Sequence, residues 1–154
     1  MKTSRLITYF VTCGRLGFAP KGPGTVTSLV SLIFWIPLLY VTCSSIWIIA
    51  ISVLLTVLAA KAVQVYEAEK NAHDLSEVTI DEWIGMGLSL SFAHPVLWQI
   101  VAAFAFFRLF DIWKPIGVKY FDVNYLKGWG VILDDVVAGI YAAICLGALQ
   151  WFFN

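Results

Sequence analysis

Charge is scarce in this chain. Acidic and basic residues make up 13% of its 154 residues, against about 25% in an ordinary soluble domain, and 60% of the residues are hydrophobic. Residues 22–60, 83–107 and 136–154 contain no acidic or basic residue at all. The net charge is zero, so no overall positive field would attract nucleic acid. The composition therefore predicts a membrane-embedded protein and argues against a nucleic-acid partner.

Cysteine and histidine are also rare. The three cysteines, Cys13, Cys43 and Cys145, are odd in number and lie in different segments, which argues against a disulfide framework. The two histidines do not cluster with cysteines, so the pattern of a zinc site is missing. A chain of this length forms one domain. We expect residues 1–154 to form a single integral membrane domain.

The lengths of the uncharged stretches predict the topology. A membrane span needs about 20 apolar residues. Residues 22–60 are long enough for two spans with a polar break at 42–45, and residues 131–153 are long enough for one more. We therefore expect an all-α fold, a small polytopic membrane bundle of about four to five membrane helices that includes one helical hairpin.

The hairpin is expected between residues 83 and 107. Pro95 interrupts this stretch, and a proline disfavours helix in the residue before it. We expect the first arm to begin near Val78 and the second to run from about 96 to 113. With a hairpin, all charged residues lie on one side of the membrane, which the positive-inside rule makes the cytoplasmic side. A single span would instead place four bases outside: Arg108, Lys114, Lys119 and Lys127.

Two pairs of adjacent acids mark the ends of apolar runs. Asp81–Glu82 opens one run and Asp134–Asp135 opens the last. Ionisable groups at such positions are costly and usually functional. Clustered carboxylates repel one another, and a hard divalent cation with oxygen ligands, magnesium rather than zinc, would offset that repulsion. The pairs predict a magnesium site held by Asp81, Glu82 and either Asp134 or Asp135. The alternative is carboxylates that only cap helix N-termini.

Three charged residues occur at intervals of three near the end of the second arm of the hairpin. They would lie on one face of a helix that ends at Pro115: Arg108, Asp111 and Lys114. Arginine suits bidentate phosphate binding and lysine supplies a point charge. We expect these residues to be catalytic, with the two bases gripping a phosphate while Asp111 binds metal or acts on phosphorus. The alternative is an ordinary ladder of ion pairs.

A glycine-rich segment precedes the first long apolar run. Glycines let backbone amides approach a ligand, and a helix start after such a loop is a plausible anion site. We expect Lys21, Gly24 and Thr25 to bind phosphate, with Thr25 as the N-cap of the first span. The alternative is a flexible break before a membrane helix.

Four motifs occur in order between about residues 14 and 141. They are Pro23–Thr25, Asp81–Met86, Phe107–Pro115 and Gly130–Gly139. The ordered set resembles the phosphatidylglycerophosphatase A family. The resemblance implies a magnesium-dependent phosphatase of the bacterial inner membrane, which cleaves its phospholipid substrate, phosphatidylglycerophosphate, to phosphatidylglycerol and inorganic phosphate. The chain departs from the family pattern at Ile116–Gly117, where members often have a second proline, and at Leu126–Lys127, where some have a histidine.

Two questions stay open at this level. The nucleophile is either a water molecule or Asp111, which would form an aspartyl-phosphate. A small ion- or proton-coupled transporter is the alternative function, because acids within membranes also mark ion pathways. Transporters tend to hold their ion site near the bilayer midplane between inverted repeats. Here the acids gather at one interface and no repeat is visible, which favours the phosphatase.

Overall fold

The computed structural model describes residues 4–42, 44–115 and 128–153, and these residues form helices joined by turns without any strand. The elements are α1 (Arg5–Val11), the short 3-10 helix η1 (Leu16–Phe18), α2 (Pro23–Thr42), α3 (Ser45–Lys70), α4 (Ile80–Ser89), α5 (Leu97–Trp113) and α7 (Trp129–Phe153). The all-α prediction is confirmed. Several residues discussed above lie outside the described ranges: Cys43, Ile116, Gly117, Lys119, Leu126 and Lys127.

Three of the described helices, α2, α3 and α7, are long and apolar enough to cross a membrane. They contain 20, 26 and 25 residues, and 20 residues of helix span about 30 Å, the thickness of a bilayer core. The two spans expected within residues 22–60 are α2 and the first part of α3. The third is α7, so the predicted spans and the observed helices agree.

The expected helical hairpin is formed by α4 and α5. Its arms begin at Ile80 and Leu97, each within about two residues of the predicted start, and the second arm ends at Trp113 as expected. The turn is held by its neighbours, since the Tyr40 hydroxyl donates to the Pro95 carbonyl (2.9 Å). The α4 arm has 10 residues and spans about 15 Å, so it is too short to cross a bilayer alone.

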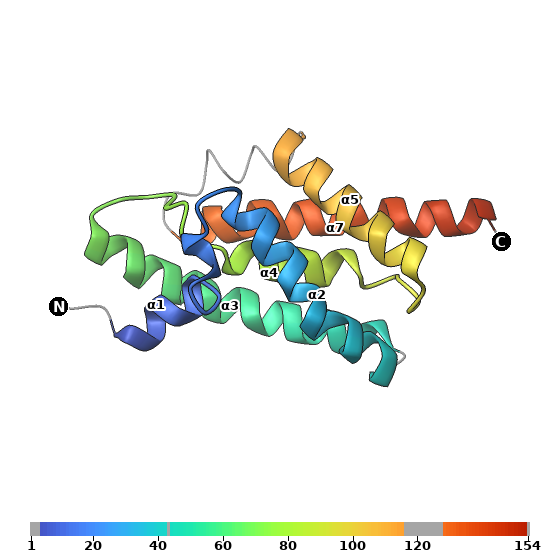
Figure 1. Ribbon diagram of the computed structural model, residues 1–154, viewed down its shortest axis with the longest axis horizontal. Helices are drawn as coiled ribbons and strands as arrows, with labels where there is room; N and C mark the ends of the chain where they lie inside the picture. Colours follow the sequence, from blue (N-terminus) through green and yellow to red (C-terminus); the bar gives the residue numbers. More distant parts are fainter. Residues whose placement is uncertain (1–3, 43, 116–127, 154) are drawn as a thin grey trace.

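Helix α4 lies at the centre of the bundle, packed against α2, α3, α5 and α7 (Figure 1). Every residue of this helix from Ile84 to Ser89 is buried. Its closest neighbour is α7, because both helices carry a glycine at the crossing. A Cβ atom added to Gly139 would overlap the carbonyl oxygen of Gly85. Small residues allow this close approach in membrane bundles, and it fixes α4 against α7.

The N-terminal segment packs against the residues that lead into α4. The Thr79 amide donates to the Val11 carbonyl (2.9 Å), and the Cys13 thiol donates to the Thr79 carbonyl (3.5 Å). Burial raises the pKa of the Cys13 thiol to about 12, so the thiol stays protonated and able to donate. The start of α4 is therefore held by α1 and its following turn.

The starts of α2, α4 and α7 and the end of α5 meet at one end of the bundle. Gly24 of α2 contacts Glu82 of α4, and Lys114 after α5 contacts Asp134 of α7. The opposite end holds the hairpin turn and the last turns of α2 and α7 (Figure 1). The charged residues of the four motifs are thus gathered at a single end.

Candidate active site

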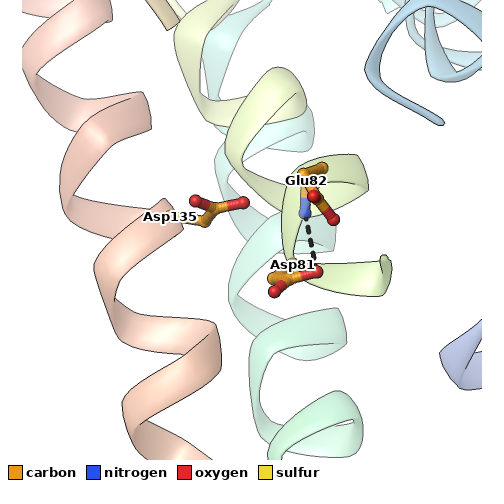
Figure 2. A group of neighbouring side chains, drawn as sticks. All are labelled: Asp81, Glu82 and Asp135. Carbon is orange, nitrogen blue, oxygen red and sulfur yellow. Dashed lines mark hydrogen bonds between the residues drawn. The ribbon is translucent and has the colours of Figure 1, made fainter. Parts of the chain in front are cut away.

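Three of the four acids predicted to bind metal come together. Asp81 and Glu82 lie in the first turn of α4, and Asp135 lies on the facing side of α7 (Figure 2). One carboxylate oxygen from each lies within 4.8 Å of those of the other two. No other group of three or more such ligands occurs in residues 4–42, 44–115 and 128–153. The arrangement offers three oxygen ligands between two helices.

Two of these acids are almost completely shielded, and Glu82 is partly buried. Asp81 and Asp135 are 7% and 4% exposed. Three carboxylates packed so closely repel one another, and burial makes that repulsion more costly than it is in water. A divalent cation would offset it, and the absence of sulfur or imidazole from the group favours a hard ion.

The local backbone explains how adjacent acids take different directions. The Glu82 amide donates to Asp81 Oδ1 (3.1 Å, Figure 2), and the Asp135 amide donates to Asp134 Oδ1 (2.9 Å). The first acid of each pair therefore fixes the backbone of the second. Neighbours on a helix point about 100° apart, so the second side chain leaves in another direction. Asp81 and Glu82 lie in the first turn of α4, where the helix dipole favours carboxylates, whereas α7 has no acid in its first turn. Capping, the alternative considered above, therefore does not account for Asp134 and Asp135.

Asp134 lies outside the three-acid group. Its Oδ2 accepts from Lys114 Nζ at 2.8 Å, joining the residue after α5 to the second turn of α7. Of the two acids in the second pair, either of which was expected to join Asp81 and Glu82, the structure thus places Asp135 in the group and Asp134 against a base.

The expected row of Arg108, Asp111 and Lys114 on one helix face is half right. Arg108 Nη1 and Asp111 Oδ2 form an ion pair of 2.5 Å one turn apart, with both side chains 16% exposed. Helix α5, however, ends at Trp113, and Lys114 has a left-handed backbone (φ 44°). Lys114 precedes Pro115, which disfavours helical geometry there. The lysine consequently turns away from the row and reaches α7.

Of the three residues expected to bind phosphate, Gly24 lies at the acids. A Cβ atom added to it would overlap Glu82 Oε1, so only a glycine leaves room for that carboxylate. Lys21 and Thr25 are exposed. Thr25 is not the N-cap, because α2 begins two residues earlier at Pro23, and proline is well suited to a first helical turn.

Several buried polar side-chain atoms have no hydrogen-bond partner among the described residues. They include Glu82 Oε2, an acceptor, and Arg108 Nε, a donor. Buried polar atoms are usually paired, and exceptions often mark a place where a ligand or ion binds. The site therefore combines three clustered acids, an arginine whose Nε has no acceptor among the described residues, and a lysine that is paired with Asp134.

Sequence reasoning missed the contact between Gly24 and Glu82 and the one between Lys114 and Asp134. Both join segments far apart in the chain. The only signal was that each residue belongs to one of the four motifs.

Comparisons with known proteins agree with the motifs. The phosphatidylglycerophosphatase A family matches residues 9–150. The phosphatidylglycerophosphatase A of Haemophilus influenzae is 36% identical, over 88% of this chain and 83% of its own length. That of Escherichia coli is 35% identical, over 82% and 73%. A candidate phosphatidylinositol-3-phosphatase of Bacteroides thetaiotaomicron is 37% identical, over 88% and 87%. No solved structure matches.

Proposed function

This chain belongs to the phosphatidylglycerophosphatase A family, and on that premise we propose that it hydrolyses phosphatidylglycerophosphate to phosphatidylglycerol and inorganic phosphate. The observation that carries the proposal is the largely buried group of Asp81, Glu82 and Asp135, whose Glu82 and Asp135 interact with residues of the Arg108–Asp111 pair. An anionic phosphate could approach three acids only with cations between them. The site is therefore suited to a metal-assisted reaction on a phosphate ester.

Magnesium is the proposed cofactor, held by Asp81, Glu82 and Asp135. The donors fit this ion, since all are carboxylate oxygens and Glu82 Oε2 has no partner among the described residues. When bound, magnesium supplies positive charge that stabilises phosphate oxygens in the transition state. Asp134, in contact with Lys114, is proposed to position that lysine.

Arg108 and Lys114 are proposed to bind the phosphate oxygens. Their charges would stabilise the negative charge that develops as the ester bond breaks. Each base is already held by an acid, Arg108 by Asp111 of the same helix and Lys114 by Asp134 of α7, so neither has to be ordered when substrate arrives.

Water is proposed as the nucleophile. Its oxygen bonds to phosphorus and loses a proton, the bond from phosphorus to the glycerol oxygen breaks, and that oxygen takes up one proton, so the protons balance. Asp111 is already engaged with Arg108, which supports an orienting role over direct attack. Rapid quenching during turnover of radiolabelled substrate would contradict this if it trapped phosphate covalently on Asp111.

The proposal is tested by measuring phosphate release from phosphatidylglycerophosphate in detergent micelles. We expect activity with magnesium and none after chelation, and we expect Asp81→Asn to abolish it. Asp74→Asn is the matched control, because Asp74 is an exposed acid outside the cluster. Full activity of Asp81→Asn at low magnesium would overturn the proposed site.

A phosphoinositide is the second candidate substrate, favoured by the relative from Bacteroides thetaiotaomicron. Phosphatidylinositol 3-phosphate belongs in the same assay, and the ratio of kcat/KM for the two lipids decides between them. All three relatives are named as lipid phosphatases, which favours this chemistry over ion transport.

We also propose that the protein lies in the bacterial inner membrane with its site on the cytoplasmic side. The bases of the described residues gather at the acid end, in keeping with the positive-inside rule. The test uses a variant without its three native cysteines. His94→Cys at the hairpin turn should react with an impermeant thiol reagent from outside, and Lys70→Cys only after permeabilisation. The reverse pattern would contradict the orientation.

A further inference from the structure

The N-terminal segment carries positive charge that the proposed reaction does not use. Residues 1–21 contain four bases and no acid, and the first acid of the chain is Glu67. Arg5 and Arg15 are exposed, and neither forms an ion pair within the residues that the structure describes. Such charge is available to an anionic partner.

A cavity of about 430 Å³ lies between these arginines. It is lined by Arg5, Thr8, Tyr9, Arg15 and Phe18. The Arg15 guanidinium stands over the Phe18 ring, 5.8 Å from its centroid. Two guanidinium groups and two hydroxyls in one cavity are suited to the oxygens of a phosphate group, which arginine binds bidentately.

The surroundings of this cavity are apolar and exposed. Leu6 is 80% exposed, and Tyr9 and Phe18 are about half exposed. Aromatic and apolar side chains flanked by arginines are typical of a segment that lies at the membrane–water interface. The phosphate most available there belongs to a lipid head group.

From these observations we propose that Arg5 and Arg15 form a binding site for the head group of an anionic phospholipid, separate from the acid cluster. The lipid phosphate would bind between the two guanidinium groups, and the acyl chains would pass beside Leu6 and Phe18. The proposal goes beyond the proposed reaction and does not depend on it, because it concerns binding alone.

The location gives such a lipid an effect on the fold. Helix α1 and the turn after it hold the start of α4 through the Thr79–Val11 and Cys13–Thr79 hydrogen bonds. A lipid bound between Arg5 and Arg15 would join α1 to the turn that follows it. It would therefore stabilise the segment on which the first turn of α4 rests.

The experiment counts phosphatidylglycerol molecules retained by the detergent-purified protein in native mass spectrometry. In the double variant Arg5→Gln/Arg15→Gln we expect weaker binding, by about five-fold for each arginine. The double variant Lys61→Gln/Lys70→Gln makes the same change of charge on α3 and should bind as the wild type does. Phosphatidylcholine, which has no net charge, should bind weakly to all of them.

Two further arms keep the result decisive. Inorganic phosphate at millimolar concentration should not displace phosphatidylglycerol, and if it does, the cavity is a site for free phosphate and the proposal is overturned. Arg5→Lys/Arg15→Lys should keep part of the affinity, and it replaces the glutamine variant if that variant does not fold. Equal loss in the α3 control would mean general attraction to anionic lipid, which also overturns the proposal. The proposed active site is unchanged in all of these variants, so any phosphatidylglycerol that binds there as product is the same in each, and the differences between variants are independent of the proposed reaction.

Discussion

The two ends of the bundle differ in how their buried polar side chains are paired. At the hairpin turn, neutral amides satisfy one another and the backbone. Gln150 Nε2 donates to Gln99 Oε1 (2.7 Å) and to the Phe92 carbonyl (2.8 Å), and Gln99 Oε1 accepts from the His94 amide. At the acid end, Glu82 Oε2 and Arg108 Nε stay buried without a partner among the described residues. A network of neutral amides whose hydrogen bonds are all made within the protein stabilises the fold. Charged groups that still lack a partner are suited to bind a ligand or an ion.

This contrast predicts opposite effects of substitution at the two ends. Asp135→Asn should abolish phosphate release, because it removes one of three clustered ligands. In chelator, its unfolding midpoint should equal or exceed that of the wild type, because a like charge is gone from a buried group. Thermal unfolding in detergent with and without magnesium checks this, with Asp74→Asn as the control. If Asp135→Asn in chelator unfolded at a clearly lower temperature than the wild type in chelator, Asp135 would be a structural residue.

Under the proposed mechanism, the acid end comprises a metal-binding group (Asp81, Glu82 and Asp135) and two bases that bind phosphate (Arg108 and Lys114). Lys114→Ala should lower kcat about 100- to 1000-fold, in the range seen when one charge-stabilising donor is removed. Lys61→Ala, an exposed base on α3, is its control.

Asp134→Asn should act through Lys114. The double variant with Lys114→Ala should then be little worse than Lys114→Ala alone, since coupled residues are not additive. Fully additive losses in kcat, or a raised magnesium requirement in Asp134→Asn equal to that of Asp135→Asn, would place Asp134 among the metal ligands instead.

The contact of α2 with the metal group gives a smaller effect. Gly24→Ala should lower activity about ten-fold and raise the magnesium needed for half-maximal rate, because the new Cβ displaces the Glu82 carboxylate. Thr25→Ala, exposed on the next residue, should leave both unchanged. A magnesium titration of the two variants makes the comparison, and identical titrations would separate Gly24 from the site.

The neutral end should show the reverse pattern. Gln150→Ala removes the donor to Phe92 and Gln99, so we expect a loss of about 1–3 kcal/mol in the free energy of unfolding with little change in kcat. Gln64→Ala, at an exposed position on α3, is the control in the same thermal unfolding measurement. A large loss of activity at unchanged stability would mean that the turn takes part in the reaction.

Much of this contrast could be predicted from the chain. Long uncharged runs fix where helices can cross a bilayer, and Pro95 fixes the hairpin turn. Because the hairpin returns the chain to the same side of the membrane, the acids at the starts of these runs were expected at one end of the bundle. The ion pair of Arg108 with Asp111 followed from their spacing of three within one helix.

The remaining features depend on where a helix stops and what it meets. Lys114 could not be placed because its spacing from Asp111 has meaning only while α5 continues, and α5 ends at Trp113. Nor could spacing tell which of Asp134 and Asp135 faces α4, since adjacent residues differ only in direction. The central position of α4 depends on its packing against four other helices, and α4 is too short to be recognised as a span.

The crossing of Gly85 with Gly139 also has a consequence in time. Helix α4 finds its closest neighbour in the last helix of the chain, and Asp135 comes from that same helix. When the hairpin has been synthesised, only two of the three clustered acids are therefore present. They lie on the short helix α4, which is not yet covered by α7. Asp81 and Glu82 therefore remain partly uncovered until α7 has been synthesised and inserted. The three-acid group therefore cannot be complete until the C-terminal helix has docked against α4.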